Sequence, residues 1–228
     1  MKKLTITALA IMLAMGSSFA QSKKNIDADD FSSVAFGVMG ELELQQGSSF
    51  KVVLEGDDDL LDAVSVRVRD GRLLISKPDW RKARNKKLYA YVTMPEVEGV
   101  SVSGSGRVFN KGSIECDDLS LSVSGSGNIE FDSFSADKVK MSVSGSGEVS
   151  LEGKGADEAD VSISGSGNVD AEDFKFEDAV VSISGSGKCT IWVTDAIRAR
   201  ISGSGDVYVK GDPNIDSRSS GSGKIRKY

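Results

Sequence analysis

The tetrapeptide Ser-Gly-Ser-Gly occurs seven times in this chain of 228 residues, at an almost constant spacing. Successive copies begin 21, 20, 20, 20, 18 and 18 residues apart, and short alternations of apolar residues flank them. A period of about 20 residues with this patterning is typical of a solenoid, in which each repeat is buried only by its neighbours. The copies begin at Ser103, Ser124, Ser144, Ser164, Ser184, Ser202 and Ser220.

The apolar residues around each copy predict how one repeat folds. In the third repeat Met141 and Val143 precede the motif and Val149 follows it, all at odd offsets from the first serine. An alternation that continues through the motif would point both glycines inward and both serines outward. Glycine inside a strand suits a corner where the wall bends or another backbone approaches closely. A second apolar set follows ten to fifteen residues after the motif serine, as at Phe134 and Val139.

These patterns predict an all-β fold. We expect a right-handed parallel β-helix of about seven rungs, each of 18–21 residues, over residues 95–228. Residues 21–94 show ordinary strand alternation, interrupted by turn residues at 56–59 and by the hairpin pair Asp70-Gly71. No linker precedes Pro95, so we expect 21–94 to pack onto or continue into the solenoid and 21–228 to form one structural domain. The alternating runs of the first region are Val34-Phe36-Val38, Leu42-Leu44, Val52-Leu54, Val64-Val66-Val68 and Leu88-Ala90-Val92.

Residues 1–20 have the pattern of a secretory signal peptide. Lys2 and Lys3 form a basic start, residues 4–15 are mostly apolar, and Ser18-Phe19-Ala20 is a small-x-small cleavage site. No other segment approaches the ~20 apolar residues of a membrane helix. We therefore expect an exported protein that is periplasmic, on the cell surface or secreted.

The chain is acidic and contains no histidine. Its formal net charge is −6, and it becomes −8 when Lys2 and Lys3 leave with the signal peptide. Nucleic-acid binding depends on neutralising phosphates with Lys and Arg, so we expect no such partner. The lack of histidine removes the usual metal ligand and general base. Cys116 and Cys189 fall in different columns of the repeat and several rungs apart, beyond the ~7 Å that a disulfide spans, so we expect two small buried side chains.

Stacked repeats turn sequence columns into ladders on the surface. Serines at −2, 0 and +2 of each motif, such as Ser122, Ser124 and Ser126, form one ladder. Its hydroxyl groups either hydrogen-bond along the stack and to water, or present a regular array to a glycan or to ice.

A second ladder is acidic, and carboxylates at about 5 Å spacing repel one another. Each carboxylate either accepts backbone N–H bonds at a turn or helps to bind calcium, although the calcium-roll signature is absent. The second alternative is the less favoured one. The ladder consists of Asp117, Asp137, Asp157, Glu177 and Asp195.

Two further groups of charged residues have alternative interpretations. Acidic residues at +6 and +8 either belong to a varied solvent-facing surface or form the carboxylate pair of a polysaccharide-active enzyme. The segment Lys77–Lys87 carries six cations and Trp80, and it is either a solvated loop or a contact site for an acidic partner. The acidic group comprises Glu130, Asp132, Glu152, Asp170 and Glu172, in columns that elsewhere contain Ser150, Thr190, Trp192, Tyr208, Lys111 and Lys210.

The run Tyr91–Val100, with its Met94-Pro95 step, leads into the first Ser-Gly-Ser-Gly copy, and the last copy closes the chain at Ser220–Ile225. Together with the intervening copies, these segments resemble the putative auto-transporter adhesin, head GIN domain family, which is common in Bacteroidetes. The resemblance covers about Asp30 to Tyr228. It implies a secreted, helix-like all-β domain that serves as an adhesin, and it assigns no catalytic or binding residue.

These observations favour an exported, non-catalytic binding module of the surface or envelope, an adhesin, with a protein or glycan ligand. The alternatives are a structural periplasmic or envelope protein without a host ligand and, least favoured, a polysaccharide-active β-helix enzyme. We assign no catalytic residue, no cofactor and no cofactor-binding residue. Lys224, Arg226 and Lys227 place charge on the last repeat and oppose stacking through that edge, while homo-oligomerisation through other surfaces stays open.

Overall fold

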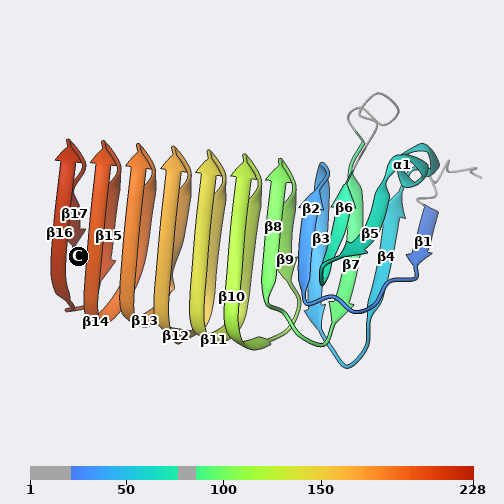
Figure 1. Cartoon of the computed structure of the whole chain (residues 1–228), viewed down its shortest axis with the longest axis horizontal. Helices are drawn as coiled ribbons and strands as arrows, with labels where there is room; N and C mark the ends of the chain where they lie inside the picture. The colour runs from blue at the N-terminus through green and yellow to red at the C-terminus, as the bar shows by residue number, and fades with distance from the viewer. Residues whose placement is uncertain (1–21, 77–85) are drawn as a thin grey trace, which may run out of the picture.

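The structure is a computed structural model that describes residues 22–76 and 86–228. Strands account for 75% of the fold and helix for 3%, and the stacked parallel strands form a β-solenoid of about six turns. All 17 described strands belong to one sheet, whose members stand side by side along the long axis in Figure 1. The predicted all-β solenoid is therefore confirmed, with a slightly smaller number of turns than the seven expected. The predicted signal peptide and residues 77–85 of the basic segment lie outside the described residues.

Each turn consists of two walls joined by the motif. The front wall contains the strands that lead into the motif, and the back wall contains those that leave it. Four long strands each run down the back wall, bend at the end opposite the motif and return up the front wall to the next motif (Figure 1). They are β11, β12, β13 and β14. The solenoid strands are β8 (Gly99–Gly104), β9 (Arg107–Asn110), β10 (Ile114–Gly125), β11 (Asn128–Gly145), β12 (Glu148–Gly165), β13 (Asn168–Gly185), β14 (Lys188–Gly203), β15 (Asp206–Lys210), β16 (Asn214–Gly221) and β17 (Ile225–Lys227).

The repeat period sets the register between neighbouring turns. Val123 pairs with Val143, which pairs with Ile163, and this parallel pairing keeps every inward residue above another inward residue. These side chains are at most 1% exposed, so the alternation predicted from the sequence places the apolar core between the walls. The core is continuous along the stack because each turn contributes the same columns.

The motif forms the corner between the walls, and only its second glycine points inward. The front strand ends at Gly125, which has a φ of +116°, and the chain bends at Ser126. Ser126 N–H donates to the carbonyl oxygen of Gly104 in the preceding turn at 2.8 Å. Gly127 is buried, and a Cβ there would lie 2.5 Å from Cγ1 of Val102. The expectation that both glycines point inward was therefore wrong for the first, because reversing the chain requires positive φ there.

The opposite end of each turn is irregular and contains the largest core side chains. Phe134 and Phe174 stack with ring centroids 5.1 Å apart and an interplanar angle of 16°. Phe134 pairs with Gly153 of the next turn, which has no side chain to separate the two rings. A Cβ on Gly153 would lie 2.3 Å from the carbonyl oxygen of Phe134. A register shift on either side of Phe134 accompanies this packing.

The first part of the chain adds layers to both walls, in an order that differs from the sequence. β2 lies between β6 and β8 on the front wall, and β3 lies between β7 and β9 on the back wall, with all four pairings parallel. The chain therefore passes over the β2–β3 layer between Met94 and Gly99 to reach β8. The side-chain amide of Gln46 supports this crossing, because Nε2 donates to the carbonyl oxygens of Pro95 and Glu115 at 3.1 and 3.0 Å. The strands are β2 (Ser33–Gly37), β3 (Gly40–Gln46), β6 (Arg72–Ser76) and β7 (Leu88–Met94).

Antiparallel strands close the N-terminal end of both walls. β1 (Ser22–Ile26) pairs with β4 (Lys51–Gly56), which pairs with β7, while β5 (Ser65–Arg69) pairs with β6. The β5–β6 hairpin turns at Asp70 and Gly71 with φ of 50° and 71°, as predicted. Where a turn was expected after β4, the chain forms the short helix α1 (Asp58–Ala63). Among the described residues, no helix is long and apolar enough to cross a membrane.

Candidate functional site: the outward faces of the two walls

The serine ladder follows the front wall and its corner, and only its column at −2 does not extend over the full length of the wall. Ser142 pairs with Ser122 on one side and Ser162 on the other, so the hydroxyl groups form a column perpendicular to the strands. In the last two turns this column changes to Arg200 and Arg218. The proposed role of the hydroxyl array in binding a glycan or ice stays a prediction.

The acidic ladder lies at the lower end of the front wall, and its members are exposed. The adjoining column contains one cation, Lys138, whose Nζ lies 2.7 Å from a carboxylate oxygen of Glu158. This contact raises the pKa of Lys138 through a hydrogen bond and the charge of Glu158. Within residues 22–76 and 86–228, no three or more His, Cys, Asp or Glu side chains form a group that could hold a metal ion. Calcium binding by Asp117, Asp137, Asp157, Glu177 and Asp195 stays an untested prediction.

A hollow of about 610 Å³ lies where residues 95–98 cross the solenoid. Glu98, Cys116 and Asp118 line it together with Gln46. Burial, followed by the charges of neighbouring aspartates, raises the pKa of the Cys116 thiol to about 11. The hollow is thus acidic and contains a thiol that stays protonated near neutral pH, which does not suit nucleophilic chemistry.

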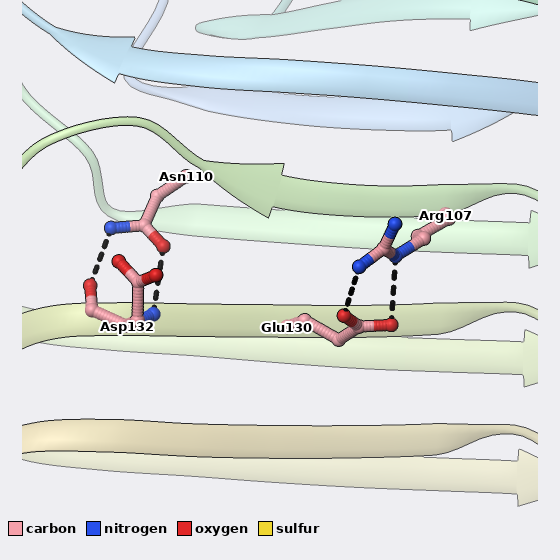
Figure 2. Close-up of polar contacts among 4 residues, drawn as sticks. All are labelled: Arg107, Asn110, Glu130 and Asp132. Atoms are coloured by element: carbon pink, nitrogen blue, oxygen red, sulfur yellow. Dashed lines mark hydrogen bonds and ion pairs between the residues drawn. The ribbon is translucent and has the colours of Figure 1, made fainter.

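The acidic residues at +6 and +8 lie on the back wall, where two of them connect neighbouring turns (Figure 2). Arg107 of β9 binds Glu130 of β11 through two contacts, of which Nε to Oε1 measures 2.8 Å. The buried amide of Asn110 donates to the backbone carbonyl of Asp132 at 2.5 Å and accepts from its N–H at 2.8 Å. These contacts give Glu130 and the Asp132 backbone a role in joining β9 to β11.

The charge of the back wall reverses along the stack. The outward positions that follow three successive motifs, from Asn128 to Glu172, contain six acids and no cation. The corresponding nine positions after the last three motifs contain four cations, three aromatic residues, one threonine and one acid. We call these nine residues the aromatic–cationic array. They are Lys188, Thr190, Trp192, Asp206, Tyr208, Lys210, Lys224, Arg226 and Tyr228.

The rings and cations of the array contact one another across the turns. Lys210 Nζ lies 4.6 Å from the ring centroid of Trp192, and Lys188 Nζ lies 4.9 Å from that of Tyr208. Arg226 Nη1 donates to the hydroxyl of Tyr208 at 2.7 Å. Tyr208 and Tyr228 meet edge to face at 6.5 Å.

Tyr228 and Lys210 connect the array to the acidic turns. Burial and a hydrogen bond to Glu172 raise the pKa of Tyr228 to about 12, so its hydroxyl stays protonated. Lys210 Nζ donates to the backbone carbonyl of Glu172 at 3.0 Å and lies 3.3 Å from a carboxylate oxygen of Asp173. The array is therefore an ordered surface in which side chains from three turns support one another.

From the sequence, Trp192, Tyr208 and Lys210 were expected to belong to a varied solvent-facing surface, without being grouped. The usable signal was a change of residue type within one column, from acidic to aromatic and basic, between Asp170 and Tyr208. The contacts of Arg226 and Tyr228 with these residues depend on the stacking of β17 on β15.

The fold recurs in solved structures. A putative adhesin from Bacteroides fragilis is 27% identical, with a TM-score of 0.85, and the match covers 92% of this chain and 98% of that one. A putative adhesin from Parabacteroides distasonis is 21% identical with a TM-score of 0.75, covering 92% and 97%. A putative lipid binding protein from the same species is 23% identical with a TM-score of 0.74, covering 92% and 98%. The search of curated proteins finds no match.

A sequence model for one family matches residues 30–213, from the second strand to beyond β15. The match includes six of the seven motif copies and both walls of the solenoid. This chain belongs to the putative auto-transporter adhesin, head GIN domain family.

Proposed function

We propose that this protein is an exported binding module of the cell surface or envelope, an adhesin, that acts without catalysis. The observation that carries the proposal is the contrast between constant inward columns and variable outward columns. The turns before the last repeat the same corner and core, whereas the back wall changes from six acids to an array of aromatic and basic residues. Exposed polar and aromatic residues on a fixed scaffold are typical of recognition surfaces.

The scaffold supports this role because it presents side chains in fixed positions. Adjacent turns are joined by backbone hydrogen bonds along both walls, and pairs such as Arg107–Glu130 add contacts between side chains (Figure 2). A surface that is ordered before binding loses little conformational entropy when a ligand arrives. The adhesin names of the family and of the Bacteroides fragilis relative agree with a binding role.

The predicted signal peptide supports export. The alternative, a structural envelope protein without a ligand, is favoured by the carboxylate and amide groups that connect turns instead of facing a ligand. The polysaccharide-active enzyme has less support, because Glu130, one of its candidate carboxylates, is engaged by Arg107.

The experiment labels intact cells with an amine-reactive biotin reagent that does not cross membranes. Exposed lysines such as Lys140 and Lys154 offer labelling sites on the described surface. Labelling suits this protein better than protease shaving because solenoid strands offer few flexible cleavage sites. We expect labelling on intact cells, with a periplasmic marker unlabelled as control. Labelling only after lysis would contradict the adhesin and favour the structural alternative.

A further inference from the structure

The aromatic–cationic array differs from the rest of the back wall in both charge and shape of its side chains. We propose that the array binds a polysaccharide that bears carboxylate or sulfate groups along its length. This inference rests on the proposed function, since it names the ligand class of the binding module.

Charge is the first reason. The array contains Lys188, Lys210, Lys224 and Arg226 against the single acid Asp206, a net of +3. The three preceding turns of the same wall carry six acids and no cation. An anionic ligand is therefore attracted to the last turns and repelled from the neighbouring ones, which fixes its position on an otherwise acidic protein.

The cations are held in place before the ligand binds. Ring contacts orient Lys188, Lys210 and Arg226, and Arg226 also bonds to the Tyr208 hydroxyl. Of the described residues, none forms an ion pair with Lys188 or with Lys224. These two ammonium groups are available to an anionic group, and the ordered side chains lose little rotamer entropy on binding it.

The shape of the array favours a sugar polymer over other anions. Rungs are spaced at about 4.8 Å, and the ammonium groups of Lys188 and Lys224 belong to the same column two rungs apart, an arrangement that suits a polymer with repeated anionic groups better than a single anion. Tyr228 is 55% exposed, and its ring offers an apolar surface against which the flat C–H face of a sugar ring can pack. A lipid would need a hollow for its chain, and a protein partner would need pockets for side-chain anchors.

The test measures binding of the mature chain to polygalacturonate, which carries a carboxylate on every sugar, by affinity electrophoresis. Its fully methyl-esterified form is the neutral control. We expect the triple variant Lys188→Gln/Lys224→Gln/Arg226→Gln to bind roughly tenfold more weakly or worse, from the sum of three exposed charge contacts. The matched front-wall variant Lys138→Gln/Lys140→Gln/Lys154→Gln, which includes Lys154 at the bend below that wall, removes the same charge, and we expect less than about a twofold change.

Tyr228→Ala tests the contribution of the ring while the charge stays unchanged. Tyr228 is 55% exposed, so the fold tolerates its truncation. We expect weaker binding with an unchanged melting temperature. Binding that also weakens as salt is added would agree with the ionic contacts.

Each contrary outcome has a distinct meaning. Failure of the wild-type chain to bind either polygalacturonate or dextran sulfate would overturn the inference, and the labelling of intact cells would still decide the proposed function separately. Equal loss in the front-wall variant would place binding outside the array. Equal binding of the esterified polymer would exclude a role for charge. Equal binding of polyglutamate or single-stranded DNA would overturn the sugar as ligand in favour of an acidic peptide or nucleic acid.

Discussion

The corner glycines offer the sharpest test of how the turns stack. Gly185 has a φ of +129°, and a Cβ there would lie 2.3 Å from the carbonyl oxygen of Gly165 in the preceding turn. That oxygen accepts the hydrogen bond of Ser186 N–H at 2.8 Å. Gly104 occupies the same motif position with a φ of +90°, but a Cβ there would have no heavy atom within 4 Å. The two sites thus separate backbone conformation from close approach.

The expected losses in the free energy of unfolding follow from this difference between the two glycines. Alanine at positive φ costs about 1–2 kcal/mol at either site. At Gly185 the clash adds about 1–3 kcal/mol of overpacking, and the displaced hydrogen bond adds about 1 kcal/mol. We therefore expect Gly185→Ala to lower the free energy of unfolding by about 3–6 kcal/mol and Gly104→Ala by about 1–2 kcal/mol.

Urea titration followed by circular dichroism measures both losses by linear extrapolation. The slope of the free energy of unfolding against urea concentration should be the same for both variants. A changed slope would indicate that the solenoid unfolds in parts. If the two variants lose stability within about 0.5 kcal/mol of each other, backbone conformation alone explains the motif and our account of close stacking is refuted.

Three further predictions concern the core and the contacts between turns. Gly153→Ala should lower the free energy of unfolding by about 2–4 kcal/mol in urea titration, because its Cβ would meet the carbonyl oxygen of Phe134 at 2.3 Å. Asn110→Ala removes three hydrogen bonds of a buried amide and should cost about 2–4 kcal/mol in the same assay; a loss below about 0.5 kcal/mol would contradict that role. Burial raises the pKa of Cys189 to about 12, so the folded state keeps a proton that the unfolded thiol releases near pH 9, and stability should fall with rising pH across this window. Cys189→Ala should reduce that fall, and in the native protein Cys189 should react with a thiol reagent more slowly than the half-buried Cys116.

Much of the fold could be predicted because the relevant signals are local and repeated. Odd-numbered apolar offsets around each motif predicted the inward columns, and Asp70-Gly71 predicted its hairpin. The helix α1 was missed because six residues are too few to show a 3.6-residue period. The conformation of Gly125 was missed because alternation alone does not indicate where a strand must reverse.

The candidate site could be predicted from the sequence only in part. The composition of the outward columns was visible, and so was the contrast between Asp170 and Tyr208. The contacts between side chains of neighbouring turns could not be predicted, because the packing of Lys210 on Trp192 depends on how those turns are offset. Likewise, Glu130 was recognisable in the sequence as an outward acidic residue, but its ion pair with Arg107 is evident only in the structure (Figure 2).

The sequence by itself determined the solenoid, because the repeat period and the parity of its apolar residues leave one register in which the core is buried. The tertiary structure alone decided the order of the layers, placing β2 and β3 between strands that follow them in the chain. The physical reason is that hydrogen bonding between strand edges depends on which edges are unpaired when the walls assemble, and no local pattern encodes that choice. The same stacking gathers the aromatic–cationic array from three turns, so the surface proposed to bind ligand exists only in the assembled fold.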